Sequence, residues 1–199
     1  YENFPVASWM LPRQMRLHIA AIYVFARIAD DFADEGAVEP EERLQRLGAW
    51  RHRLRDSLSG VSDGWFQSSG DDSQSKTAFC TDQKSLFLAL ANTIRSRRLP
   101  VRLFEDLLSA FEQDVVVHRY QSWHQLLDYC SRSANPVGRL VLRVAGYDDP
   151  ALDRASDCLC TALQLTNFWQ DFARDYRVGR LYLPADDSDA VGADEADLD

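Results

Sequence analysis

Residues 13–34 read RQMRLHIAAIYVFARIADDFAD, and this stretch decides the fold class. Pro12 precedes it, at a position where the start of a helix tolerates proline. Apolar residues then recur at helical spacing, namely Ile19, Ile22, Tyr23, Ala26, Ala29 and Ala33. The spacing predicts an amphipathic helix that runs to Asp34 and stops before Gly36.

The rest of the chain is also predicted to be helical. Pro40 begins a second helix, with Glu41 and Glu42 in its first turn, that runs to about residue 59. Further helices are predicted over residues 83–97, 101–118, 122–145 and 150–176. Pro136 lacks an amide donor and disfavours helix at Asn135, so the helix over 122–145 should kink or break there. Strand alternation and fixed-period repeats are absent from the sequence, which predicts an all-α protein.

The domain organisation is predicted to be one helical domain over residues 1–184, incomplete at its C-terminus. Residues 60–82 are rich in Ser, Gly, Asp and Gln, which is typical of a long surface loop inserted between helices. Residues 185–199 are acidic and show no periodicity, so we expect a disordered tail. That tail supplies neither a cap nor a closing helix, and we expect the chain to be a truncated fragment.

Charge and composition exclude several classes of protein. The formal net charge of −9 repels nucleic acid and anionic membrane surfaces, although divalent cations can still bring a phosphorylated ligand to an acidic protein. The sequence has no run of 18 apolar residues, so a transmembrane segment is not expected and only peripheral contact with the inner membrane stays open. The four cysteines, Cys80, Cys130, Cys158 and Cys160, form no CxxC pair, which favours a reduced, cytoplasmic protein.

Two pairs of aspartates carry the chemistry, Asp30 with Asp34 and Asp171 with Asp175. A spacing of four residues on a helix brings both carboxylates to one face, with the Cβ atoms about 5–6 Å apart. Mg²⁺ binds to one or two such carboxylates together with substrate phosphates. Spacing alone is weak evidence, because residues 153 and 157 form the same pattern in a stretch that reads as a solvated face.

The neighbours of these pairs are apolar. Desolvated carboxylates among them would cost several kcal/mol without a metal or a cationic partner. From the residues alone, a metal site and a structural role are about equally favoured, and Arg27 lies one turn before Asp31, as a plain salt bridge requires. The nearby aromatic residues could line a cavity that stabilises carbocations or could simply form the core; they are Phe4, Tyr23, Phe25, Tyr129, Phe168 and Trp169.

Longer motifs add a resemblance to a known family. The opening NFPVAS at residues 3–8, AIYVFARIADDFADE at 21–35 and QLTNFWQDFARD at 164–175 resemble the squalene/phytoene synthases, as does GRLYLP at 179–184. The opening and NPVGRL at 135–140 most resemble the bacterial hydroxysqualene synthase branch. The resemblance implies the isoprenoid-synthase fold, an all-α bundle with a central cavity.

The resemblance also implies a reaction and a set of site residues. The expected reaction is Mg²⁺-dependent loss of diphosphate from presqualene diphosphate, after which water traps the rearranged cation as hydroxysqualene. Mn²⁺ is expected to be able to replace Mg²⁺. The implied metal ligands are Asp30, Asp34, Asn167, Asp171 and Asp175. The implied contacts to the substrate diphosphate are Tyr23, Arg27, Gln164 and Asn3.

Three alternatives stay open at this point. The protein could instead join two farnesyl or geranylgeranyl diphosphates head to head. It could be a catalytically silent homologue that serves in assembly, or an acidic helical interaction domain without a ligand. If the cavity lacks helices beyond residue 184, we expect weak activity or none.

Overall fold

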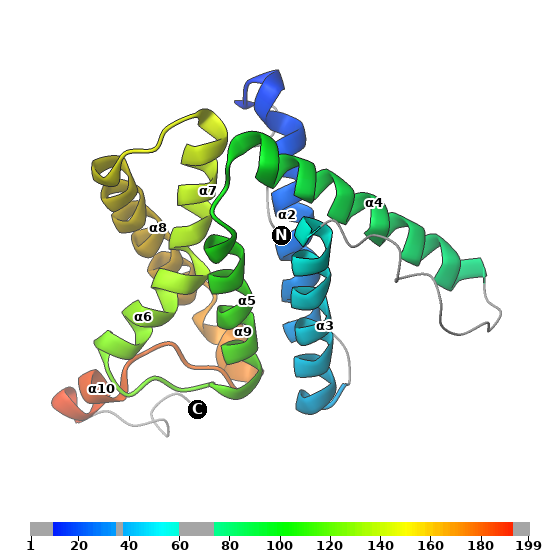
Figure 1. The fold of residues 1–199 in the computed structure, drawn as a ribbon. Helices are drawn as coiled ribbons and strands as arrows, with labels where there is room; N and C mark the ends of the chain where they lie inside the picture. The colour runs from blue at the N-terminus through cyan, green and yellow to red at the C-terminus, as the bar shows by residue number, and fades with distance from the viewer. Residues whose placement is uncertain (1–9, 35–37, 60–73, 193–199) are drawn as a thin grey trace. The chain divides into compact units, whose positions relative to one another are not determined.

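The structure is a computed structural model that describes residues 10–34, 38–59 and 74–192, with the backbone alone for 74–82. Every regular element in these ranges is a helix, which confirms the all-α prediction (Figure 1). A single isolated β-bridge, between Arg119 and Leu181, is the one strand-like contact that these ranges contain. The helices are α2 (Arg13–Asp34), α3 (Pro40–Ser59), α4 (Gln74–Arg97), α5 (Val101–Val116), α6 (Trp123–Ser133), α7 (Asn135–Ala145), α8 (Pro150–Gln170), α9 (Phe172–Arg177) and α10 (Ala185–Val191).

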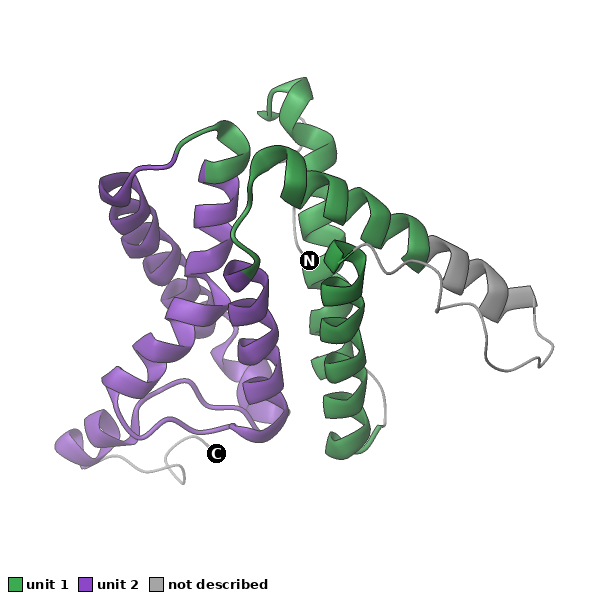
Figure 2. Ribbon diagram, in the orientation of Figure 1, with its two compact units in different colours: residues 1–101, 143–147 green, residues 102–142, 148–199 purple. Residues whose placement is uncertain are grey.

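The chain divides into two compact units (Figure 2). Unit 1 comprises residues 1–101 and 143–147, and unit 2 comprises residues 102–142 and 148–199. The prediction of one domain over residues 1–184 therefore stays a prediction, and each unit is described by itself.

Unit 1 is built on the packing of α2, α3 and α4. Trp50 of α3 is its centre, since the indole stacks on Phe25 of α2 at 5.8 Å and meets Phe87 of α4 edge-on at 4.6 Å. The indole N–H also donates to the carbonyl oxygen of Phe25 over 3.3 Å. Burying these large rings removes much apolar surface from water and fixes the face that α2 turns inward.

Unit 2 buries a separate core between α5, α6 and α8. Its fully or nearly fully buried members are Ala110, Tyr120, Leu126, Tyr129, Cys130 and Phe168. Gly138 lets α7 and α8 approach closely, because a Cβ there would lie 2.2 Å from the Ser156 hydroxyl oxygen and 2.6 Å from Cys160 Sγ. As predicted, the chain breaks before Asn135, with Pro136 in the first turn of α7.

Two predicted irregular segments contain helix. The predicted loop over 60–82 is wrong from Gln74 onward, where α4 begins, while residues 60–73 lie outside the described part. The predicted disordered tail is wrong over Ala185–Val191, which form α10. Acidic residues fill the first turn of α10 and Gly192 ends it with a φ of 68°, both favourable to a short helix.

α10 is also anchored by specific contacts to Gln121, just before α6, and to Trp123, the first residue of α6. The Trp123 indole N–H donates to Asp187 over 2.7 Å, and the Gln121 amide donates to Asp186 over 2.9 Å. These contacts explain why an acidic, aperiodic stretch is ordered, since partners distant in the sequence replace the missing apolar pattern.

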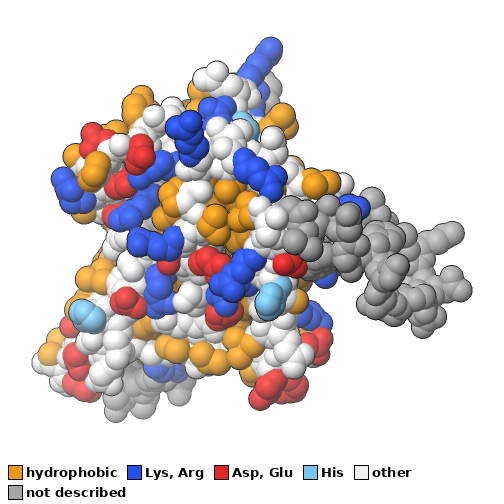
Figure 3. All heavy atoms as spheres, in the orientation of Figure 1, with side chains coloured by type: hydrophobic (Ala, Val, Ile, Leu, Met, Phe, Trp, Pro, Cys, Tyr) orange, Lys and Arg blue, Asp and Glu red, His pale blue; other side chains and the backbone are white. Residues whose placement is uncertain are grey.

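The described surface mixes charges of both signs. Figure 3 shows acidic and basic side chains interspersed with hydrophobic ones on the face turned toward the viewer. Among the residues that the structure describes, we find no helix with the length and hydrophobicity that a membrane span requires.

Candidate active site

The first aspartate pair lies at the C-terminal end of α2. Ala29 and Ala33 are fully buried, so Asp30 and Asp34, each one residue later, sit at the edge of the buried stripe. The Asp30 side chain is 33% exposed and Asp34 is exposed, which means that neither carboxylate is desolvated within unit 1. The helix continues through both residues, as predicted, so the two carboxylates share one edge of a rigid element.

Arg27 bridges two acids of this motif. Its Nη1 lies 3.3 Å from Asp30 Oδ2, and its Nη2 lies 2.9 Å from Asp31 Oδ1. The salt bridge to Asp31, which the sequence left open as an alternative role for Arg27, is therefore present. Tyr23, one turn earlier on α2, is half-buried. Because a guanidinium has five N–H donors, Arg27 can keep its ion pairs with Asp30 and Asp31 and still donate to a phosphate oxygen.

The second pair lies at a break between two helices. The prediction of one helix from residue 150 to 176 is wrong, because α8 ends at Gln170 and α9 begins at Phe172. Asp171 joins them with φ −92° and ψ 3°, well away from the helical ψ of about −42°. Its N–H still donates to the Asn167 carbonyl over 2.8 Å, and its own carbonyl accepts from the Asp175 N–H over 2.9 Å. Backbone hydrogen bonds between residues four apart therefore continue across the break, from Asp171 to Asn167 and from Asp175 to Asp171.

The two acids of this second pair differ in environment. The Asp171 side chain is 43% exposed and lies 2.9 Å from Arg174. The Asp175 side chain is only 15% exposed, with Arg174 at 3.7 Å. Burial raises the pKa of Asp175 above its ordinary value; Arg174 opposes this shift, and the negative charge of Asp171 adds to it. Two carboxylates that repel each other at a half-buried position suit a divalent cation.

The remaining predicted site residues lie along the end of α8, or outside the described part. Gln164 is half-buried and Asn167 is exposed, and with Asp171 they follow helical spacing along one face. Asn3 lies outside the described residues, as does Phe4.

The two pairs belong to different units, the first to unit 1 and the second to unit 2. Within residues 10–34, 38–59 and 83–192, no three His, Cys, Asp or Glu side chains form a group that could bind one metal ion. Each pair alone offers carboxylate oxygens from one helix edge or junction, which is the partial ligand set that Mg²⁺ completes with phosphate oxygens and water. Each pair therefore fits part of a divalent-metal site.

A buried polar cluster beside the second pair was missed in the sequence. Asp114 of α5 is 6% exposed and accepts a hydrogen bond from the Tyr129 hydroxyl over 2.8 Å. Burial, followed by the negative charge of Asp114, raises the pKa of Tyr129 and Tyr182, which keeps both hydroxyls protonated. One signal was present, since Asp114 lies seven residues after Leu107 on the buried face of α5.

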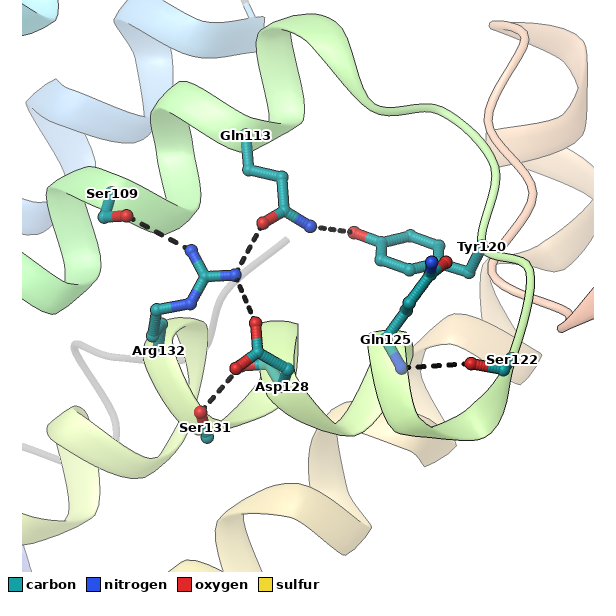
Figure 4. Close-up of polar contacts among 8 residues, drawn as sticks. All are labelled: Ser109, Gln113, Tyr120, Ser122, Gln125, Asp128, Ser131 and Arg132. Carbon is teal, nitrogen blue, oxygen red and sulfur yellow. Dashed lines mark hydrogen bonds and ion pairs between the residues drawn. The ribbon is translucent and has the colours of Figure 1, made fainter.

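A set of hydrogen-bonded side chains that includes Arg132 and Gln113 extends to Tyr120, beside this cluster (Figure 4). Arg132 donates to Gln113 Oε1 over 2.6 Å and to Asp128 over 2.8 Å. The amide nitrogen of Gln113 then donates to the Tyr120 hydroxyl over 3.3 Å. Arg132 thereby fixes the orientation of the Gln113 amide and, through it, the hydroxyl of Tyr120.

The aromatic candidates divide into core and exposed residues. Phe25 and Tyr129 are buried in the cores of units 1 and 2, and Phe168 packs against Tyr182 at 3.9 Å. Trp169 is 59% exposed, so it does not belong to the core of unit 2. Simple core packing therefore describes Phe25, Tyr129 and Phe168 within their units.

Sequence comparison finds a matching family model and related enzymes. Residues 1–199 match the family model described as squalene/phytoene synthase. The chain is 41% identical to the hydroxysqualene synthase of Zymomonas mobilis, over 99% of this chain and 59% of that protein. It is 30% identical to the phytoene synthase of Mycobacterium tuberculosis, over 96% of this chain and 56% of that protein. The chain spans about three fifths of the length of these curated relatives.

Solved structures share the fold. The crystal structure of squalene synthase HpnC from Alicyclobacillus acidocaldarius matches with a TM-score of 0.81 and 37% identity, over the whole of this chain and 66% of that one. A dehydrosqualene synthase matches with a TM-score of 0.74 at 23% identity, over 98% of this chain and 60% of that one. The fold predicted from the motifs, that of the isoprenoid synthases, is confirmed.

Proposed function

The chain belongs to the squalene/phytoene synthase family, and on that premise we propose that it converts presqualene diphosphate to hydroxysqualene with release of diphosphate. The observation that carries the proposal is the pair of acidic motifs, each with two aspartates four residues apart. The 41% identity to the hydroxysqualene synthase of Zymomonas mobilis favours this product over others of the family.

The reaction breaks the bond between carbon and the diphosphate oxygen, and the diphosphate leaves with the electron pair. Bound Mg²⁺, or Mn²⁺ in its place, supplies Lewis-acid stabilisation of that leaving group. The chain would hold the metal through Asp30, Asp34, Asn167, Asp171 and Asp175. That both motifs serve one ligand is part of the proposal.

Residues around the motifs would orient the diphosphate. Arg27 offers a planar fork suited to phosphate oxygens, and Tyr23, Gln164 and Asn3 would add neutral donors. After ionisation, the cyclopropylcarbinyl cation rearranges, one water molecule adds its oxygen to carbon, and the released proton leaves to solvent or to diphosphate. Apolar surroundings would delay this capture until the rearrangement is complete.

A second candidate within the family is head-to-head joining of two farnesyl or geranylgeranyl diphosphates. The 30% identity to the Mycobacterium tuberculosis phytoene synthase favours it as the alternative. A silent homologue, or an interaction domain without a ligand, would leave both acidic motifs without a chemical role.

The test is a diphosphate-release assay with and without Mg²⁺, on presqualene diphosphate and farnesyl diphosphate separately, followed by product mass. We expect Mg²⁺-dependent release from presqualene diphosphate and the mass of hydroxysqualene. Asp30→Ala and Asp171→Ala should each abolish release and keep the fold. Asp153→Ala is the matched control, because it has the same four-residue spacing to Asp157 outside both motifs.

Two results would separate the candidates. A coupled C₃₀ product from farnesyl diphosphate would favour the head-to-head reaction. Absence of Mg²⁺-dependent release from every substrate, with no Mg²⁺ binding by calorimetry, would refute the enzymatic proposal and favour a silent homologue.

A further inference from the structure

The two rings of an aromatic stack flank the second acidic pair in the sequence. The rings of Phe168 and Tyr182 lie 3.9 Å apart at their centroids and only 3° from parallel. Phe168 precedes Asp171 by three residues, and Tyr182 follows Asp175 by seven. The chain therefore leaves α8 at Gln170, two residues after Phe168, passes through both aspartates, and returns to place Tyr182 on the Phe168 ring.

Backbone contacts hold the returning segment in place. The N–H of Arg180 donates to the Asp175 carbonyl over 2.8 Å, directly tying the segment to the pair. The N–H of Leu181 donates to the His118 carbonyl over 3.0 Å, and Arg119 donates to the Gly179 carbonyl over 2.6 Å. Gly179 has a φ of +83°, a conformation that glycine adopts without strain, and the turn needs it.

The helix that carries Asp175 is short and has no side-chain cap at the break. Asp171 caps α9 without any side-chain hydrogen bond to the backbone, and α9 is only six residues long. No residue of α9 is buried. Contacts outside α9 can therefore add to those of the half-buried Phe172 and Tyr176 in setting the angle between α8 and α9, and the Phe168–Tyr182 stack joins the chain on either side of this junction.

We propose that Tyr182 is a positioning residue for the second acidic pair: its ring, stacked on Phe168, fixes the junction between α8 and α9 and so the placement of Asp171 and Asp175. The metal-binding part of this inference rests on the proposed function. The conformational part rests on the stack alone. Supporting residues of this kind typically change metal affinity about 10–100-fold when they are removed.

The experiment compares Tyr182→Ala with Tyr182→Phe, which keeps the stacked ring and removes only the hydroxyl. Hydrogen exchange of the backbone amides over residues 171–180 is measured first. We expect faster exchange there in Tyr182→Ala and unchanged exchange in Tyr182→Phe. Tyr147→Ala is the matched control, because Tyr147 is 56% exposed and belongs to unit 1.

Mg²⁺ binding in the presence of inorganic diphosphate is the second readout. We expect roughly tenfold weaker binding in Tyr182→Ala and wild-type binding in Tyr182→Phe. If Tyr182→Ala does not fold, Tyr182→Leu retains apolar volume without a flat ring and should show the same loss. Wild-type exchange over residues 171–180 in a folded Tyr182→Ala or Tyr182→Leu variant would overturn the inference.

The two proposals fail in different ways. If the wild-type chain binds no Mg²⁺, the proposed function fails, while the exchange measurement still decides whether Tyr182 fixes the junction. If Mg²⁺ binds equally well to wild type and to Tyr182→Ala, the positioning role fails and the proposed function stands.

Discussion

Arg139 and Asp157 form a two-pronged ion pair between α7 and α8. Arg139 Nε donates to Asp157 Oδ1 over 2.9 Å, and Nη2 donates to Oδ2 over 2.5 Å. The Asp157 side chain is 19% exposed, so the sequence interpretation of this segment as a solvated face is wrong at Asp157. This carboxylate serves as a cross-link between helices.

Removing this ion pair should destabilise unit 2. We expect Asp157→Asn to lower the free energy of unfolding by about 1–3 kcal/mol, because it weakens two charge-assisted hydrogen bonds at a mostly buried position. Chemical denaturation measures the loss. A double-mutant cycle with Arg139→Gln isolates the pairwise energy, and a coupling near zero would contradict the prediction.

Substitution of Gly138 should be costly for a steric reason. A Cβ in Gly138→Ala would overlap Ser156 Oγ at 2.2 Å and Cys160 Sγ at 2.6 Å. We expect a loss of about 1 kcal/mol, since both atoms end short side chains that must leave their present rotamers to make room. Thermal and denaturant unfolding provide the measurement.

Gly48→Ala is the matched control for this substitution. Gly48 lies inside α3, and a Cβ there has no neighbour within 4 Å. Because alanine is the better helix former, the control should gain about 0.5–1 kcal/mol. Equal effects at both positions would show that helix propensity, and not the approach of α7 to α8, governs Gly138.

The pKa of Asp175 predicts a stability cost at neutral pH. Because burial raises this pKa above the unfolded value, the metal-free protein loses stability as pH rises through the folded pKa, when the buried carboxyl must ionise. Asp175→Asn removes that cost. We expect the variant to be more stable than wild type at pH 7 and equal to it at about pH 3, below both pKa values.

Unfolding curves at several pH values without added metal test this expectation. Adding Mg²⁺ and diphosphate should then stabilise wild type more than Asp175→Asn, because only wild type keeps the anionic ligand. A variant that is less stable than wild type at neutral pH would contradict the pKa argument.

Local signals in the sequence predicted most helix boundaries. The prolines at 40, 136 and 150 each lie at the start of a helix, because proline tolerates that position and no other in a helix. The break at Asp171 has no such signal, since neither proline nor glycine is near it and its backbone geometry depends on tertiary contacts. The start of α4 was hidden by a Ser-rich composition, and α10 depends on partners such as Trp123 that lie about sixty residues earlier.

The candidate site was also predictable only in part, because some of its contacts are tertiary and leave no local pattern in the sequence. Apolar neighbours and longer motifs, added to helical spacing, selected both aspartate pairs, and spacing alone suggested the ion pair between Arg27 and Asp31. Spacing could not reveal the buried contact of Asp114 with Tyr129, because that bond joins two helices through the core. Whether the two pairs approach each other is likewise a property of tertiary structure, and local pattern carries no information about it.

The break at Asp171 makes the two acidic pairs mechanically unequal. Asp30 and Asp34 lie on one continuous helix, so their separation can change only if hydrogen bonds of that helix are distorted. Asn167 and Asp175 stand on opposite sides of a single non-helical residue, and rotation about its backbone would alter their separation with both helices intact. The Phe168–Tyr182 stack joins the chain on either side of that residue, so it is the contact that would restrain such a rotation in unit 2.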